Sequence, residues 1–250
     1  MISVVINTYN AERHLDAVLQ SVSGFDEVVI CDMESTDSTL EIARRHGCRI
    51  VIFPRGEHRI VEPARQYAIE QAKNPWVLLV DADELVSPAL REVLYAYSAR
   101  EDAPAGLFIP RKNYFMGRFM HCHYPDYLLR FFKREAVTWP PYVHAIPRIE
   151  GSTDRLPAAR KELAFEHLAN DSIGDILHKT DQYTDYELLK KQGKHYGPLA
   201  YLWRPFFRWF KAYILKGGIR DGLPGFIKAC LEGYYQFIML AKMAERRRCP

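Results

Sequence analysis

Three acidic side chains follow an apolar run in the segment WVLLVDADELVSP, residues 76–88. Asp81 and Asp83 are one residue apart, and Glu84 comes next. Carboxylates this close repel one another at neutral pH unless positive charge lies among them. Alternate residues of an extended chain point to one side, so Asp81 and Asp83 can face the same ligand. Paired oxygen ligands suit Mg²⁺ or Mn²⁺ held together with substrate phosphates, and the alternative is a solvated acidic turn.

The elements that must position these acids alternate between two periodicities over the first hundred residues. Continuous apolar strands are buried on both faces, so we predict a doubly wound α/β fold, Rossmann-like, with a mostly parallel sheet flanked by helices. Ser87 before Pro88 predicts a capped helix that extends to about Tyr97. The predicted strands are ISVVI, EVVICD, RIVIF and WVLLVDAD, and helical spacing falls over 11–22, 39–46 and 63–73.

Polar segments follow all four predicted strands. They are NTYN, DMESTDS, PRGEHR and DADE. Ligands of such sheets bind at the carboxyl ends of the strands, so the four loops predict one site. Loops of α/β proteins are polar in any case, which accounts well for PRGEHR and poorly for DADE.

The pattern changes after residue 105. GLFIPRKNYF, YLLRFFKR and YVHAIPRIEG are strand-like, and we expect further strands, some antiparallel, that complete the sheet. From residue 171 onward helical patterns dominate.

Bulk composition excludes several classes. The 250 residues are 48% hydrophobic and 26% charged, with a net charge of +3, so nothing indicates a nucleic-acid partner. Five cysteines without a C-x-x-C pair favour a reducing compartment. MISVVINTYN resembles a strand rather than a signal peptide, and no apolar run is long enough to span a bilayer. We therefore expect a cytoplasmic protein.

The segments VVINTYN, VVICDMESTDST and WVLLVDADE together resemble the nucleotide-sugar-binding half of family 2 glycosyltransferases, which have the GT-A fold and are inverting enzymes. YPDYLLRFFKR, VHA and FEHL resemble a small bacterial subgroup that includes lipopolysaccharide-core glucosyltransferases. The resemblance implies a GT-A catalytic domain over 1–170, with the donor half in 1–100 and the acceptor side in 101–170. A helical extension would occupy 171–250.

The implied reaction moves a sugar from a nucleotide-sugar donor, expected to be UDP-linked, to a hydroxyl of a glycan or lipid-linked acceptor in cell-envelope synthesis. Thr8 and Tyr9 would lie at the donor, with Tyr9 stacked on or bordering the nucleobase. Asp32 would accept hydrogen bonds from the base, and Glu34 would support it.

The resemblance also assigns the acids. Asp81 would face the ribose or the metal, and Asp83 would bind Mg²⁺ or Mn²⁺ directly. Arg65, in EPARQYA, matches a family arginine near the nucleotide, although Gln66 replaces the more common asparagine and a surface charge is nearly as good an interpretation. The family's usual acid after VH is Ala145 here.

Inverting transfer needs a carboxylate that takes the proton of the attacking hydroxyl, while the metal stabilises the leaving diphosphate. Asp126, in HYPDYLLRF, is the candidate because it matches the acid of the subgroup's PD…RLF pattern. A turn aspartate after proline is the alternative.

The histidines permit two interpretations. His121 and His123 flank Cys122, but zinc sites want four ligands and no partner motif is visible, so a structural or acceptor-site role is favoured. His144 and His167 match histidines of the subgroup and would reach the diphosphate or metal, or else lie satisfied in the core.

Residues 199–216 combine aromatic side chains with a basic stripe, in which Arg204, Arg208 and Lys211 are spaced at i, i+4 and i+7. This pattern is typical of an interfacial helix at an anionic membrane, here a peripheral contact at the inner face of the cytoplasmic membrane. Alternatively, the aromatics pack on the catalytic domain. A second helix over 224–247 would dock along the first or pair with another subunit as a homodimer.

Two other functions remain open from the sequence. A sugar-phosphate nucleotidyltransferase would want a glycine-rich loop after the first strand, but NTYNAERH has no glycine. A non-catalytic nucleotide-sugar-binding or membrane-docked scaffold protein is the other.

Overall fold

The computed structural model describes residues 1–56, 58, 61–141, 147–168, 172–190 and 196–248. The chain divides into two compact units, which we call the sheet unit (1–112 and 125–168) and the helical unit (113–124 and 169–250). The division near residue 168 lies close to the expected boundary at 170. The segment 113–124, in contrast, groups with the helices although it lies between two strands of the sheet unit.

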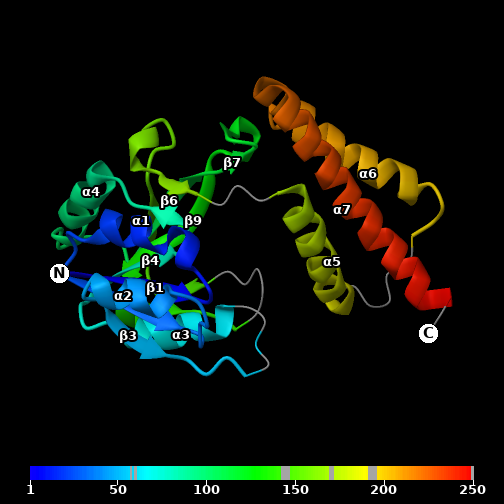
Figure 1. Ribbon diagram of the computed structural model, residues 1–250. Helices are drawn as coiled ribbons and strands as arrows, with labels where there is room; N and C mark the ends of the chain where they lie inside the picture. The colour runs from blue at the N-terminus through cyan, green and yellow to red at the C-terminus, as the bar shows by residue number, and fades with distance from the viewer. Residues whose placement is uncertain (57, 59–60, 142–146, 169–171, 191–195, 249–250) are drawn as a thin grey trace. The chain divides into compact units, whose positions relative to one another are not determined.

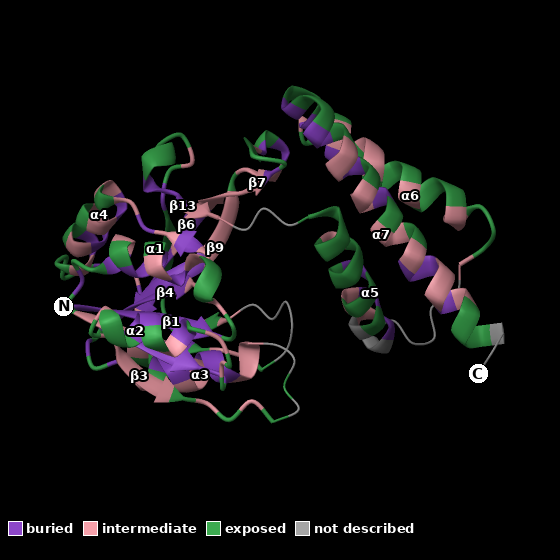
Figure 2. Cartoon of the chain, in the orientation of Figure 1, coloured by how far each residue is buried: buried purple, intermediate pink, exposed green. Residues whose placement is uncertain are grey.

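The sheet unit is built on a nine-stranded sheet with the order β3-β2-β1-β4-β9-β6-β13-β5, to which β12 is added at β6. Four parallel strands form one half, and β9 is antiparallel to both its neighbours, β4 and β6. All of β1 and most of β4 are buried, as Figure 2 shows, because both sheet faces are covered. The expected mixed, mostly parallel α/β sheet is therefore confirmed. Its main strands are β1 (Ile2–Thr8), β2 (Glu27–Asp32), β3 (Arg49–Ile52), β4 (Trp76–Asp81), β6 (Gly106–Lys112) and β9 (Asp126–Lys133).

Helices cover both faces of this sheet (Figure 1). Leucines of α1 and α4 pack into one core cluster with Ile42 of α2, whereas alanines of α3 pack into a second cluster. The Ser87 hydroxyl accepts the N–H of Leu90 at 3.0 Å, which confirms the predicted cap. The helices are α1 (Glu12–Val22), α2 (Thr39–Arg45), α3 (Glu62–Glu70) and α4 (Pro88–Ser98), within one to three residues of the predicted spans.

Short elements complete the sheet unit. The strand-like segment 106–115 is interrupted at Asn113, so β6 stays in the sheet and the next strand, β7, belongs to the helical unit. The first half of YVHAIPRIEG, including His144 and Ala145, lies outside the described residues. The remaining elements are β5 (Glu84–Leu85), β10 (Val137–Thr138), β11 (Arg148–Ile149), β12 (Thr153–Arg155), β13 (Phe165–His167) and the 3₁₀ turns η2 (Arg134–Ala136) and η3 (Lys161–Leu163).

The helical unit contains three long helices. Helix α7 packs along both α5 and α6, and Figure 1 shows α6 and α7 side by side. This is the docking expected for the second helix, while pairing with another subunit stays a prediction. Among the described residues, no helix is long and apolar enough to cross a bilayer. The helices are α5 (Ile173–Lys190), α6 (Ala200–Phe210) and α7 (Gly222–Arg248), with a π-helical turn η4 (Lys211–Leu215) and a 3₁₀ turn η5 (Gly218–Asp221) between the last two.

The segment 113–124 also belongs to this unit and holds the strands β7 (Tyr114–Phe115) and β8 (Arg118–Phe119). His121, Cys122 and His123 form a 3₁₀ turn, η1, so the strand geometry assumed for the two histidines is wrong. The buried carboxylate of Asp221 accepts the backbone N–H groups of His121 and Cys122, at 2.9 and 3.0 Å. It also contacts Nδ1 of His121 at 2.7 Å. A structural role for His121 follows, because its ring is already held by a carboxylate.

Candidate donor and metal site

Asp81, the last residue of β4, lies between two arginines. Nη2 of Arg65, from α3, donates to Oδ1 at 2.9 Å, and Nη2 of Arg130, from β9, donates to Oδ2. Burial alone would raise the pKa of Asp81, but the charges of Arg130 and Arg65 overcome it and hold the pKa well below its usual range. Asp81 is therefore an ionised carboxylate whose two oxygens are both engaged by guanidinium groups.

A third arginine connects the acidic triplet to Asp126. Nη1 of Arg111 donates to Glu84 at 3.0 Å, while its Nε and Nη2 donate to Oδ2 of Asp126 at 3.1 and 2.8 Å. Arg111 of β6 lies directly opposite Asp126 of β9 in the antiparallel register, so strand pairing itself sets this contact. The side chain of Glu84 is fully buried and also accepts the N–H of Asp81 at 3.1 Å.

These contacts change the answer to the charge problem posed by the sequence. We expected a divalent cation among the acids, and the structure places three guanidinium groups there, from Arg65, Arg111 and Arg130. Of these, only Arg65 was among the predicted site residues. Arg130 carries the clearest signal, because a charged residue inside the apolar strand YLLRFFKR is seldom buried unless it is paired.

Asp83 has different neighbours. Its Oδ2 lies 3.3 Å from Nε2 of His167, and its carbonyl accepts the N–H of Leu168 at 2.7 Å, so the end of β13 is held beside it. His14, on α1, is near the same pair. Burial and the charge of Arg13 lower the pKa of His14, against the opposing effect of Asp83.

The residues around Asp83 fit a hard divalent cation only together with a substrate. No group of three metal-ligating side chains converges anywhere in the described part of the chain. Mg²⁺ and Mn²⁺ usually bind through one or two carboxylates and complete their coordination with water and phosphate oxygens. Asp83 is about one-third exposed and retains access to such a ligand, whereas both oxygens of Asp81 are already occupied by arginine.

Asp32 organises the loops after the first two strands. Its buried carboxylate accepts the hydroxyl of Thr8 at 2.8 Å, and the backbone N–H and hydroxyl of Ser35 at 2.8 and 2.6 Å. The predicted role of Asp32 toward a base stays a prediction. Its observed role is to hold the end of β1 against the loop that follows β2, and the sequence did not single out Ser35.

Tyr9 and Glu34 come together with the third loop. The guanidinium of Arg55 lies 3.7 Å above the centre of the Tyr9 ring, and Glu34 accepts the backbone N–H of Arg55 at 3.0 Å. Glu34 has a positive φ of 62°, a conformation uncommon for a residue other than glycine. One face of Tyr9 is therefore covered by Arg55, which lies in the loop whose polarity had been explained by loop composition alone.

The carboxyl edge of the sheet thus gathers most predicted positions into two neighbouring groups. The first group consists of Thr8, Tyr9, Asp32 and Glu34. The second group consists of Arg65, Asp81, Asp83, Asp126 and His167. An α/β sheet with acids following the fourth strand is the arrangement expected of the GT-A class of glycosyltransferases.

Comparisons with known proteins agree. Residues 3–148 match the family model described as glycosyl transferase family 2. Because that match covers more than half of the chain, the protein belongs to glycosyl transferase family 2.

Similar proteins extend over almost the whole chain. The lipopolysaccharide core biosynthesis glycosyltransferase LpsC of Rhizobium meliloti (strain 1021) is 26% identical over 98% of this chain and 92% of its own. An uncharacterized glycosyltransferase of Rickettsia bellii (strain RML369-C) is 25% identical over 98% of this chain and 86% of its own. The mannosyltransferase PcManGT from Pyrobaculum calidifontis, solved with GDP-Man and Mn²⁺, shares the fold with a TM-score of 0.59 at 15% identity, over 97% of this chain and 86% of that one.

Proposed function

We propose that this glycosyltransferase is metal-dependent and inverting, and that it moves a hexosyl group to a hydroxyl of a glycan or lipid-linked acceptor in lipopolysaccharide or cell-envelope synthesis. The donor is a nucleoside-diphosphate sugar, with UDP as the proposed nucleotide. Likeness to LpsC supports the acceptor class. The observation that carries the reaction is the series of ion pairs that joins Asp81, through Arg130, Glu84 and Arg111, to Asp126.

Asp83, with His167 beside it, would hold Mg²⁺ or Mn²⁺ against the diphosphate of the donor. When bound, the cation supplies Lewis-acid stabilisation of the leaving diphosphate. Asp81 has a different part, because it fixes Arg65 and Arg130. Nη1 of Arg65 and Nε of Arg130 are buried and have no hydrogen-bond partner among the described residues.

Asp126 would act on the acceptor. The acceptor oxygen attacks the anomeric carbon as the bond from that carbon to the diphosphate oxygen breaks, and the hydroxyl proton passes to the carboxylate of Asp126. Arg111 donates two N–H groups to Oδ2 of Asp126 and so fixes the orientation of that carboxylate. Attack from the face opposite the leaving group inverts the configuration.

A lipid-linked acceptor would be met at the inner face of the cytoplasmic membrane, and this location is part of the proposal. Formation of a homodimer through the helical unit stays a prediction.

The test is a donor screen. We expect slow release of nucleoside diphosphate from one nucleotide sugar, dependent on Mn²⁺ or Mg²⁺ and abolished by EDTA. Product NMR after transfer to a hydroxyl acceptor would show the inverted anomer. Pyrophosphate release from a nucleoside triphosphate and a sugar phosphate would instead identify a nucleotidyltransferase, and donor binding without any turnover would identify a binding protein.

A further inference from the structure

Helix α6 has two apolar faces, of which its own unit uses one. At about 100° per residue, Tyr201, Pro205 and Trp209 share one side of the helix. This side packs on α7: a Cβ at Gly233 would lie 3.0 Å from the carbonyl oxygen of Pro205 and 3.6 Å from Cβ of Trp209. Core packing therefore accounts for this face alone.

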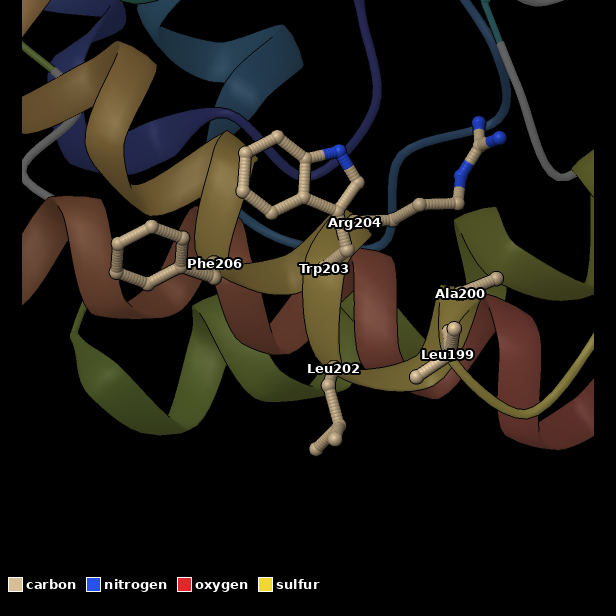
Figure 3. Close-up of a pocket in the computed structure, with 6 residues that line it drawn as sticks. All are labelled: Leu199, Ala200, Leu202, Trp203, Arg204 and Phe206. Atoms are coloured by element: carbon tan, nitrogen blue, oxygen red, sulfur yellow. The ribbon is translucent and has the colours of Figure 1, made fainter.

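The second face is apolar and exposed. Leu202 is 75% exposed and Trp203 is 62% exposed, and Figure 3 shows both on the same turn of α6. At the same helical spacing the exposed apolar positions span an arc of about 140°. The large exposed apolar side chains on α6 and its first flanking residue are Leu199, Leu202, Trp203, Phe206 and Phe207.

A surface hollow marks the start of this face. Its volume is about 860 Å³, and Figure 3 shows the six residues that line it, most of them apolar. Exposed apolar residues continue beyond α6 through Leu215, Ile219 and Leu223 to Phe226. We call the exposed apolar residues from 199 to 226 the α6 surface. This many large exposed apolar side chains within one short stretch is typical of an interaction site.

Positive charge accompanies the α6 surface. The sequence from 188 to 220 contains eight Lys and Arg residues and no Asp or Glu. In contrast, α5 carries four acids, and two of these, Asp181 and Asp185, pair with Lys242 of α7. The acids of α5 are therefore on a different element from the cations of 199–220. The exposed cations among the described residues of this stretch are Arg204, Arg208, Lys211, Lys216 and Arg220.

We propose that the α6 surface docks on an anionic lipid bilayer, with the aromatic and leucine side chains at the headgroup boundary and the cations against lipid phosphates. A broad apolar arc with cations along one edge, in a stretch without acids, is the pattern that an anionic bilayer complements. The inference rests on the proposed function only for its biological purpose, which is to bring the active site to a lipid-linked acceptor.

The primary test is co-sedimentation of the full chain with vesicles of phosphatidylcholine, alone or mixed with phosphatidylglycerol. We expect binding at least about tenfold stronger to the mixed vesicles, and weaker at high salt because salt screens the cations. Equal binding to both vesicles, or no binding to either, would overturn the proposal.

A matched pair of double variants locates the contact. Leu202→Glu with Phe206→Glu should lower vesicle binding by about tenfold or more, because both apolar side chains leave the boundary and two like charges meet the lipid. Ile173→Glu with Leu177→Glu is the control, since these two are also four residues apart and exposed, but lie on α5. Equal loss in both would contradict docking through α6, provided that circular dichroism shows both folded.

Trp203 provides a spectroscopic readout. Brominated lipid should quench tryptophan fluorescence of the wild-type chain, and Trp203→Phe should bind equally well but lose most of that quenching. Unchanged quenching in Trp203→Phe would place the lipid elsewhere.

Two further measurements separate the possible outcomes. If sedimentation velocity shows a dimer that Leu202→Glu with Phe206→Glu splits, and vesicles are not bound, a second copy covers the surface and the proposal fails. Donor hydrolysis in solution should be unchanged in the same double variant. Vesicle binding without any donor hydrolysis in the wild type would overturn the proposed function and leave the docking intact.

Discussion

The two charged regions of the molecule are organised in opposite ways. Around Asp81 the arginines are buried and paired with carboxylates of the same chain, whereas the cations of α6 are exposed along a stretch without acids. In the first region charge holds the protein's own elements in place, and Asp83, which has no arginine partner among the described residues, is the carboxylate that we propose for the ligand. In the second region the stretch itself contains no acids, and we propose that a lipid bilayer supplies the complementary charge.

This comparison has an energetic counterpart. Removing one partner of a buried ion pair leaves an uncompensated charge and costs roughly 3–5 kcal/mol, whereas most surface substitutions change stability by less than about 0.5 kcal/mol. Variants of the two regions should therefore differ in what they damage. The expected effects below run from the largest to the smallest.

Asp126→Asn should lower the rate of sugar transfer by about 10²–10⁴-fold, because the amide cannot take the proton of the acceptor hydroxyl. Donor affinity should be nearly unchanged, which equilibrium binding of the nucleotide sugar can check. Transfer at the wild-type rate would remove Asp126 from the mechanism.

Glu84→Gln should lower the free energy of unfolding by roughly 3–5 kcal/mol, because Arg111 and Arg130 lose a buried charged partner. Denaturant unfolding measures this change. The control is Glu162→Gln, whose ion pair with Arg160 is at the surface and whose loss should leave stability unaltered. Similar midpoints for both variants would show that the buried pairs contribute no more than exposed ones.

Saturating Mn²⁺ with nucleoside diphosphate should stabilise the wild type by about 2.7 kcal/mol when the ligand is at one hundred times its dissociation constant. Asp83→Asn should abolish the part that depends on Mn²⁺, and EDTA should do the same for the wild type. Thermal unfolding with and without the cation measures both. A full Mn²⁺ effect in Asp83→Asn would assign the cation to other ligands.

Asp221→Asn should cost about 2 kcal/mol of stability, because charge-assisted hydrogen bonds to η1 are weakened. Burial raises the pKa of Asp221. The hydrogen bonds from the N–H groups of Cys122 and His121 lower it by a larger amount, so the pKa in the folded protein lies below the usual 3.8. The stability that ionised Asp221 contributes is fully present at pH values above its usual pKa. It is lost as the pH falls through the lower pKa of the folded state. The stability difference between wild type and variant should therefore shrink in acid.

Arg208→Gln should change stability by less than about 0.5 kcal/mol, since the side chain is exposed. Its vesicle affinity should fall by about fivefold, in line with the contribution of one cation near an anionic surface. A large loss of stability in Arg208→Gln with unchanged vesicle binding would contradict this prediction, because it would show that Arg208 stabilises the fold and does not contact lipid.

Much of the fold could be predicted because its signals are local. Apolar runs, helical spacing and the Ser87 cap depend on neighbours along the chain, and the first four strands and helices follow from them. The arginine pairs could not be predicted in the same way. Arg111 meets Asp126 through the register of two strands, and Arg65 meets Arg130 at a carboxylate on a third element.

Other features depend on contacts between distant segments. His121 is placed by Asp221, one hundred residues later, so its neighbours in sequence suggested a strand where a 3₁₀ turn exists. The basic aromatic pattern of 199–216 was visible, but only packing distinguishes the face of α6 that meets α7 from the face that is exposed. Local patterns thus identified most of the candidate acids and Arg65, and missed Arg111 and Arg130, which also position the acids.

The arginines also affect how a nucleotide can approach. The acidic side chains at this edge carry four formal negative charges, and the three guanidinium groups reduce the net charge to −1. The four acids are Asp81, Asp83, Glu84 and Asp126. An incoming diphosphate therefore meets only weak repulsion at the bare edge of the sheet. We therefore expect the proposed nucleotide and cation to bind in either order, a random-order scheme that initial-rate kinetics would distinguish from a compulsory one.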